Sequence, residues 1–117
     1  MEQFDHERLD VYQIALDWVV LAQDVARSLP RGNAELADQL QRAACSIVLN
    51  IAEGAGEFSA AEKARFYRMA KRSATECAAV LDVAKRRSAI TDEHYTQSRS
   101  LLLRIVSMLV KLVRAHS

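Results

Sequence analysis

Apolar residues recur along the first quarter of the chain at alternating spacings of four and three residues. This spacing keeps them on one side of an α-helix, which turns once about every 3.6 residues. Nothing interrupts a helix until Pro30 and Gly32, because proline lacks the backbone N–H that a helix needs. We therefore expect a helix over residues 9–29 with one buried face. Its apolar positions are Val11, Ala15, Trp18, Ala22, Val25 and Leu29.

Three further helices follow from the same periodicity and from signals at their ends. We expect them over residues 34–53, 59–87 and 91–115. Thr91 and the acids after it suit the first turn of the last one. With three glycines and one proline in 117 residues, the sequence predicts an all-α, antiparallel up-down-up-down four-helix bundle, in a single domain over residues 1–117. The expected stripe of the second helix is Leu36, Leu40, Ala43, Ile47 and Ile51.

Two glycines, Gly54 and Gly56, lie between the second and third helices. We expect Gly54 to end the second helix in a left-handed conformation. Ser59 and Glu62 have the spacing of a capping box, in which the serine accepts the Glu62 amide and the carboxylate reaches back. A phosphate-binding loop needs a preceding strand and a lysine at a fixed place, which this stretch lacks. We interpret it as a hinge with caps, an anion site being the alternative.

The last two predicted helices are apolar over more of their surface than one core requires. Apolar residues between Leu101 and Val113 cover roughly two thirds of the circumference, whereas a stripe just over about 100° wide satisfies one core. The third helix has an apolar face that includes Phe66, Ser73 and Cys77, with Tyr67, Ala74 and Ala78 beside it. Because a helix that is apolar on two sides packs on two sides, we expect a homo-oligomer.

The second predicted helix also carries a line of polar residues at helical spacing. If the line is partly buried, it forms a polar seam that fixes the register between subunits, as a buried asparagine does in coiled coils. The alternative is a solvated face with one or more ion pairs. The line includes Gln39, Arg42, Ser46, Asn50 and Glu53.

The sequence lacks patterns typical of catalysis or metal binding. His6, His94 and His116 belong to no Glu-x-x-His pair or zinc-ligand spacing, and no Gly-x-Ser-x-Gly elbow occurs. We therefore expect a protein that is not an enzyme and holds no metal or cofactor. Cys45 and Cys77 are expected to be small buried residues in a reducing cytoplasm. No apolar run approaches the roughly 20 residues that span a membrane.

Charge is divided between the two halves of the chain. Residues 1–62 contain four Lys or Arg and eleven Asp or Glu, whereas residues 63–117 contain twelve and four. The excess of Lys and Arg in the second half indicates a basic surface that binds the phosphates of nucleic acid. We expect Glu76, four residues after Arg72, to neutralise that arginine only in part. A protein-interaction scaffold, whose acidic and basic halves dock on each other or on a partner, remains the alternative. The expected nucleic-acid-binding residues are Arg65, Arg68, Lys71, Arg72, Arg86, Arg104, Lys111 and Arg114, with Lys85 and Arg87 extending the set.

Residues 9–15, 28–30, 39–47, 50–54 and 59–66 together resemble one protein family. They are similar to the four-helix-bundle proteins encoded within intervening sequences of bacterial large-subunit ribosomal RNA genes. That family is distantly similar to the accessory variability determinant of diversity-generating retroelements. The resemblance implies a pentameric, ring-like assembly that associates with structured RNA or with a protein such as a reverse transcriptase. Family members carry a basic residue directly after Glu-Gly-x-Gly, where this chain has Glu57, which argues against an anion site at the hinge.

Overall fold

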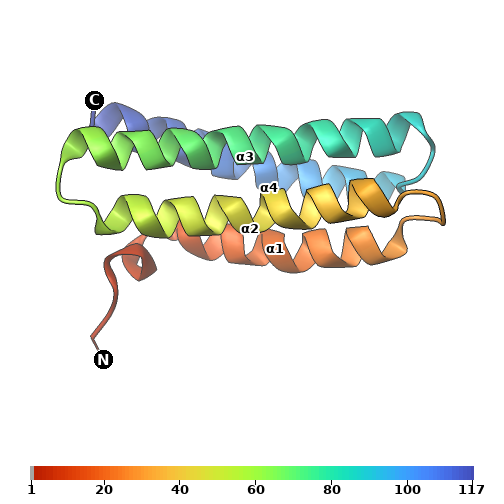
Figure 1. The fold of residues 1–117 in the computed structure, drawn as a ribbon, viewed down its shortest axis with the longest axis horizontal. Coiled ribbons are helices and arrows are strands. Elements are labelled where there is room, and N and C mark those ends of the chain that lie inside the picture. Colours follow the sequence, from red (N-terminus) through yellow and green to blue (C-terminus); the bar gives the residue numbers. More distant parts are fainter. Residues whose placement is uncertain (1) are drawn as a thin grey trace.

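A computed structural model describes residues 2–117 of the protein, which form four α-helices joined by short turns (Figure 1). No β-strand occurs among these residues, so this part of the chain is all-α, as the sequence predicts. A short 3₁₀-helix, which the sequence patterns do not predict, precedes the bundle. The elements are η1 (Asp5–Arg8), α1 (Asp10–Ser28), α2 (Ala34–Gly56), α3 (Ala60–Arg86) and α4 (Asp92–Ala115).

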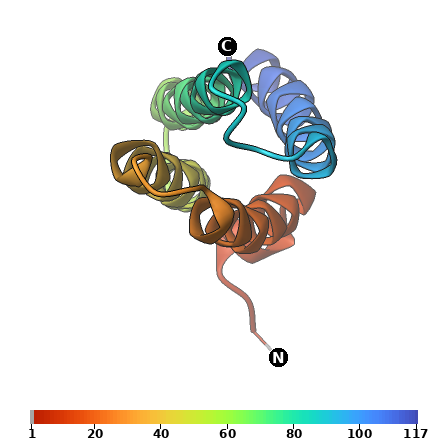
Figure 2. The same ribbon diagram turned by 90° about the vertical axis from the view of Figure 1, so that its right-hand side faces the viewer.

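Consecutive helices are joined at alternate ends of the bundle, so sequence neighbours run antiparallel (Figure 1). Viewed along the bundle, the helices occupy the corners of a square, with α4 beside α1 (Figure 2). All four helices contribute to one hydrophobic core. Its largest fully buried side chains include Trp18 from α1, Ile47 and Ile51 from α2, Leu81 from α3, and Ile105 and Leu109 from α4.

The apolar periodicity predicts the buried faces of α1 and α2 well. The α1 stripe is buried from Val11 to Val25, and Leu29 at its end is half-buried. All five residues of the predicted α2 stripe are buried. The predicted helix ends lie within one residue of the observed ones, except that α2 continues three residues past Glu53.

The buried face of α3 is rotated relative to the predicted one. Tyr67 and Ala74, expected beside the apolar face, are buried, whereas Phe66 and Ser73 are only half-buried. The physical reason is that α3 packs against both α2 and α4, so its buried face is centred between these two neighbours. Phe66 and Ser73 lie at the edge of this face, on the side of α2.

The prediction that Gly54 ends α2 in a left-handed conformation is wrong. α2 continues through Gly56, and the glycine with a positive φ in the described chain is Gly32. Gly54 is buried within the helix, where the lack of a side chain lets α3 come close. A Cβ at Gly54 would lie 2.9 Å from Cε1 of Tyr67 and 3.0 Å from Cβ of Phe66. The glycine is therefore needed for helix packing.

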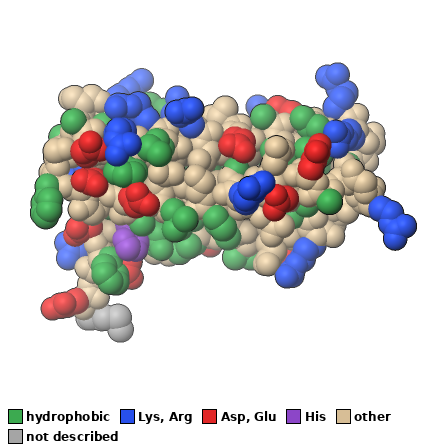
Figure 3. Space-filling view, viewed as in Figure 1, with side chains coloured by type: hydrophobic (Ala, Val, Ile, Leu, Met, Phe, Trp, Pro, Cys, Tyr) green, Lys and Arg blue, Asp and Glu red, His purple; other side chains and the backbone are tan. Residues whose placement is uncertain are grey.

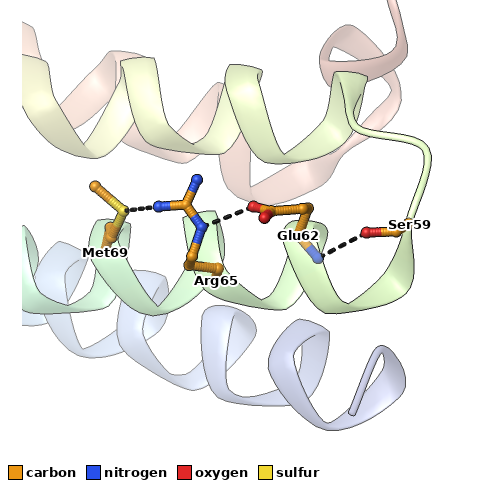
Figure 4. Close-up of polar contacts among 4 residues, drawn as sticks. All are labelled: Ser59, Glu62, Arg65 and Met69. Atoms are coloured by element: carbon orange, nitrogen blue, oxygen red, sulfur yellow. Dashed lines mark hydrogen bonds and ion pairs between the residues drawn. The ribbon is translucent and has the colours of Figure 1, made fainter.

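Ser59 caps α3 as predicted, but only half of the capping box forms. The Ser59 hydroxyl accepts the backbone N–H of Glu62 at 3.1 Å (Figure 4). The Glu62 carboxylate turns instead to Arg65, whose Nε lies 2.7 Å from Glu62 Oε2. A guanidinium is a stronger partner for a carboxylate than a neutral amide, so the charged pair replaces the second half of the box.

The two cysteines lie in different environments. Cys77 is buried as predicted, but Cys45 is exposed, so the prediction of a buried Cys45 is wrong. Cys45 follows the buried Ala44 by about 100° around the helix, which turns it away from the core. Burial raises the pKa of the Cys77 thiol to about 12, and the nearby Trp18 indole offsets a smaller part of this rise.

We expect a thiol reagent at pH 8 to label Cys45 and to spare Cys77 in the folded protein. The thiolate is the reactive form, and a pKa of about 12 keeps Cys77 protonated. Ellman's reagent should detect one fast thiol per chain, and two after unfolding in guanidinium chloride. The Cys45→Ser variant is the control, and fast labelling of that folded variant would contradict the burial of Cys77.

Candidate nucleic-acid interface

α3 presents three arginines on its exposed side. Arg65, Arg68 and Arg72 are spaced by three and four residues, so they lie about one helical turn apart on one side of the helix. All three are exposed, and the residues that α3 buries lie on the other side. We call these three arginines the α3 ridge. Figure 3 shows Lys and Arg side chains gathered along the edge of the molecule that α3 forms.

Arg65 is held in place by its neighbours on α3. Besides its ion pair with Glu62, it places Nη1 3.6 Å from Sδ of Met69 (Figure 4). Its guanidinium carbon lies 4.5 Å from the centre of the Phe66 ring. The side chains of Arg65 and Glu62 remain 52% and 46% exposed. Exposed pairs of this kind are weak, so Arg65 can exchange Glu62 for another anion.

Arg68 and Arg72 carry charge that no ion pair neutralises within residues 2–117. The expected pairing of Arg72 with Glu76 does not form. On a helix, an ion pair is weaker when the acid follows the base by four residues than when the acid comes first. The side chains of Arg72 and Glu76 are also both exposed to solvent. An unpaired guanidinium offers a planar set of N–H donors that matches phosphate oxygens. Two members of the ridge are therefore free to bind an anion.

Two further α3 residues expected to bind nucleic acid are exposed but lie off the ridge. Arg86 comes fourteen residues after Arg72, which places it roughly 20 Å further along the helix at about 1.5 Å per residue. Lys71 lies one turn before Thr75, which lines a groove between α3 and α4. The five α3 residues expected to bind nucleic acid thus form the ridge and two separate positions.

The two residues expected to extend the set, Lys85 and Arg87, have local partners instead. Lys85 Nζ lies 4.2 Å from the centre of the Tyr95 ring. Tyr95 donates a hydrogen bond of 2.8 Å to Asp82, and this bond raises the pKa of Tyr95. Arg87 donates to the side chain of Asn33 at 3.3 Å. These contacts link the C-terminal end of α3 to α4 and to the residue that precedes α2.

The basic residues of α4 belong in part to a different surface. Arg104, Lys111 and Arg114 are all exposed. Lys111, however, lines a groove of about 400 Å³ between α4 and the start of α1, beside Leu9 and Asp10. Because this groove lies on the α1 side of α4, the structure does not join Lys111 to the α3 ridge.

A polar groove of about 390 Å³ runs between α2 and α3 beside the ridge. The Ser46 and Ser73 hydroxyls share a hydrogen bond of 2.8 Å across it. Nδ2 of Asn50 donates to the carbonyl oxygen of Ser46 at 2.9 Å and to its hydroxyl at 3.1 Å. We call this site the α2–α3 groove. It is lined by Ser46, Asn50, Met69, Arg72, Ser73 and Glu76.

The polar line of α2 therefore divides into two parts. Ser46 and Asn50 are half-buried and bonded as described above, so they form a seam between two helices of one chain. Gln39, Arg42 and Glu53 are exposed, and Arg42 pairs with Asp38 at 2.8 Å. The solvated face with an ion pair occurs at Arg42. A seam that fixes the register between subunits stays a prediction.

Lys63 closes the turn between α2 and α3, a role that the sequence patterns did not reveal. Its Nζ donates to the carbonyl oxygens of Ala55 at 2.8 Å and of Gly54 at 3.4 Å. The last carbonyl groups of a helix lack partners within it, and a cation there also compensates the helix dipole. The available signal was a lysine in the first turn after a glycine-rich helix end.

We expect Lys63→Met to lower the free energy of unfolding by about 1 kcal/mol, because it removes a charged cap and keeps most of the aliphatic stem. Urea unfolding followed by circular dichroism measures the difference. Lys71→Met is the matched control, since Lys71 is exposed and its loss should cost less than about 0.5 kcal/mol. Equal losses in the two variants would show that the Lys63 cap contributes nothing.

Within residues 2–117, no three His, Cys, Asp or Glu side chains group closely enough to hold a metal ion. Each histidine has its own neighbour: His6 packs on Tyr12, His94 lies 3.3 Å from the Ser28 hydroxyl, and His116 contacts the carbonyl of Leu112. None of the helices over these residues has the length and apolar character needed to cross a membrane.

Comparison with known proteins agrees with the resemblance noted in the sequence. A solved structure of a protein with unknown function, from the S23 ribosomal protein family of Bacteroides thetaiotaomicron VPI-5482, superposes with a TM-score of 0.81. The two sequences are 24% identical, and the match covers 88% of this chain and 97% of that one. No curated protein matches the chain significantly. The family described as 23S rRNA-intervening sequence protein matches residues 7–111, and the chain belongs to this family.

Proposed function

We propose that this protein is a non-catalytic, cytoplasmic homo-oligomer that binds structured RNA through the phosphate backbone. The observation that carries the proposal is the α3 ridge, in which the unpaired Arg68 and Arg72 follow Arg65 after about one and two helical turns, and Arg65 is held by its neighbours. Phosphate contacts supply most of the affinity of sequence-independent binding, and arginine is the side chain best suited to them.

Self-association is part of the proposal, because one ridge supplies few contacts and a ring of subunits repeats it. Large apolar side chains support this view: Val20 is 62% exposed on α1, Leu49 is 60% exposed on α2 and Leu103 is 57% exposed on α4. A contact with a further subunit would remove these side chains from water. The pentamer comes from the family resemblance.

Fluorescence anisotropy with a labelled RNA hairpin tests the binding. We expect the logarithm of the association constant to fall linearly with the logarithm of salt concentration, with a slope of about −0.9 for each contacted phosphate. Different hairpin sequences of similar shape should bind within a few-fold of one another if the ridge alone holds them. A protein that binds no hairpin even at low salt would overturn the proposal.

Light scattering tests the assembly. We expect Val20→Glu to lower the mass of the oligomer, because it places a charge where an apolar contact is proposed. Gln23→Glu adds the same charge to an exposed position of the same helix without removing apolar surface, and it serves as the control. If Val20→Glu leaves the mass of the oligomer unchanged, α1 does not contribute to the contact between subunits through Val20.

The division of charge favours a second candidate, a protein-interaction scaffold. α1 and α2 lie together on one side of the bundle and carry six acids and two bases, whereas α3 and α4 lie on the other side and carry eleven bases and five acids (Figure 2). These sides can dock on each other or on a partner protein, such as the reverse transcriptase that the resemblance implies. Assembly mass that falls with salt, without any RNA binding, would favour this candidate.

A further inference from the structure

We propose that the α2–α3 groove receives an unpaired guanine base from the RNA whose backbone lies on the α3 ridge. The inference rests on the proposed function. Arg72 belongs to both the ridge and the groove, so a nucleotide with its phosphate on the ridge has its base beside the groove. Phosphate contacts position an RNA without reading its sequence. The groove adds a contact that reads one base.

The floor of the groove carries hydrogen-bonding atoms that the described chain leaves unused. The carbonyl oxygen of Ser46 can only accept, which fixes the Asn50 amide with Nδ2 toward it. Oδ1 of Asn50 has no partner within residues 2–117. The Ser46 and Ser73 hydroxyls share one hydrogen between them, which leaves the other available to a ligand.

Glu76 decides which ligand fits the groove. Its carboxylate is exposed and forms no ion pair within the described chain. This charge repels a phosphate from the groove, so phosphates stay on the arginines. A carboxylate can accept two parallel N–H bonds. Guanine alone among the four bases has two adjacent donors, N1–H and N2–H, on its Watson–Crick edge. In each of the other three bases, at least one of two adjacent atoms on this edge is an acceptor, and the carboxylate repels that atom.

The remaining lining residues suit a flat ring. Met69 offers a polarisable thioether that packs against aromatic rings. The Arg72 guanidinium is planar and can stack on a base as well as bind a phosphate. Unpaired bases in loops and bulges are the parts of an RNA that proteins read by such contacts. A hairpin loop on the ridge presents a base of this kind.

Competition anisotropy with five hairpins tests the inference. The hairpins share one stem and differ at a single unpaired loop position, which holds guanine, inosine, adenine, cytosine or uracil. We expect the guanine hairpin to bind roughly fivefold or more tightly than the adenine one, the low end for a bidentate contact. Inosine, which lacks the 2-amino group, should fall between them. Glu76→Gln should reduce the preference below about twofold.

The controls separate this inference from the proposed function. Asp17→Asn removes a carboxylate from α1, on another helix of the bundle, and should keep the guanine preference. Equal binding of all five hairpins, weakened throughout by Arg68→Glu, overturns the guanine site and leaves RNA binding intact. A Glu76→Gln variant that changes the mass of the assembly but not the hairpin preference shows a protein contact, and also overturns it. Failure of every hairpin to bind overturns both proposals.

Discussion

Gly54→Val is expected to lower the free energy of unfolding by about 3 kcal/mol, the upper part of the range for overpacking. The added Cβ would lie 2.9 Å from the Tyr67 ring and 3.0 Å from Cβ of Phe66. Tyr67 is buried, and Cβ of Phe66 moves only with its backbone, so neither can rotate away. The helices α2 and α3 must separate instead, which breaks contacts along their length. Urea unfolding measures the loss.

Gly56→Val is the matched control for this prediction. Gly56 is the last residue of α2, and a Cβ built there meets no atom within 4 Å. We expect its substitution to change the stability by no more than about 0.5 kcal/mol. Equal losses of unfolding free energy in the two variants would show that valine near the helix end causes the loss. The close approach of the helices at Gly54 would then not contribute to it.

Reversal of all three charges of the α3 ridge is expected to weaken RNA binding about a hundredfold, from roughly 1 kcal/mol for each arginine. The Arg65→Glu, Arg68→Glu, Arg72→Glu variant loses three phosphate contacts and gains repulsion. The salt dependence should also become shallower, by about one unit of slope for each lost contact. Anisotropy over a salt series measures both quantities in one experiment.

A second triple variant, in which Arg104, Lys111 and Arg114 become glutamate, changes net charge by the same amount on α4. Lys111 lies in a groove beside α1, away from the ridge, so we expect a clearly smaller loss. Equal losses in the two variants would mean that the RNA responds to total charge, and the ridge would not be the binding surface.

Much of the fold follows from sequence because each of α1 and α2 has one dominant apolar stripe. Every stripe residue from Val11 to Val25 and from Leu36 to Ile51 is buried. The face of α3 is harder to predict, since it packs between two helices and its burial depends on where they lie. Ser73 shows this: its place on an apolar face is visible in the sequence, but its bond to Ser46 is not.

The candidate site is less accessible to sequence reasoning. The helical spacing of Arg65, Arg68 and Arg72 predicts the ridge, because local geometry alone sets it. The groove depends on which residues of α3 face α2, which no local pattern specifies. Gly54 illustrates the limit, since a glycine that permits a left-handed turn and one that permits close packing look alike in a sequence. Only the neighbouring Tyr67 ring distinguishes them.

The packing of α2 on α3 bears on how the chain folds. It is the most extensive contact between two helices, and only the turn at residues 57–59 separates them. Closing so short a loop costs little chain entropy, so this hairpin should form before α1 and α4 dock. Substitutions between the two helices should then slow refolding, whereas core substitutions in α1 should mainly speed unfolding. Stopped-flow kinetics of these variants would show the order in which the helices form. Slower refolding of the α1 variants would show that α1 forms early and would contradict the proposed order.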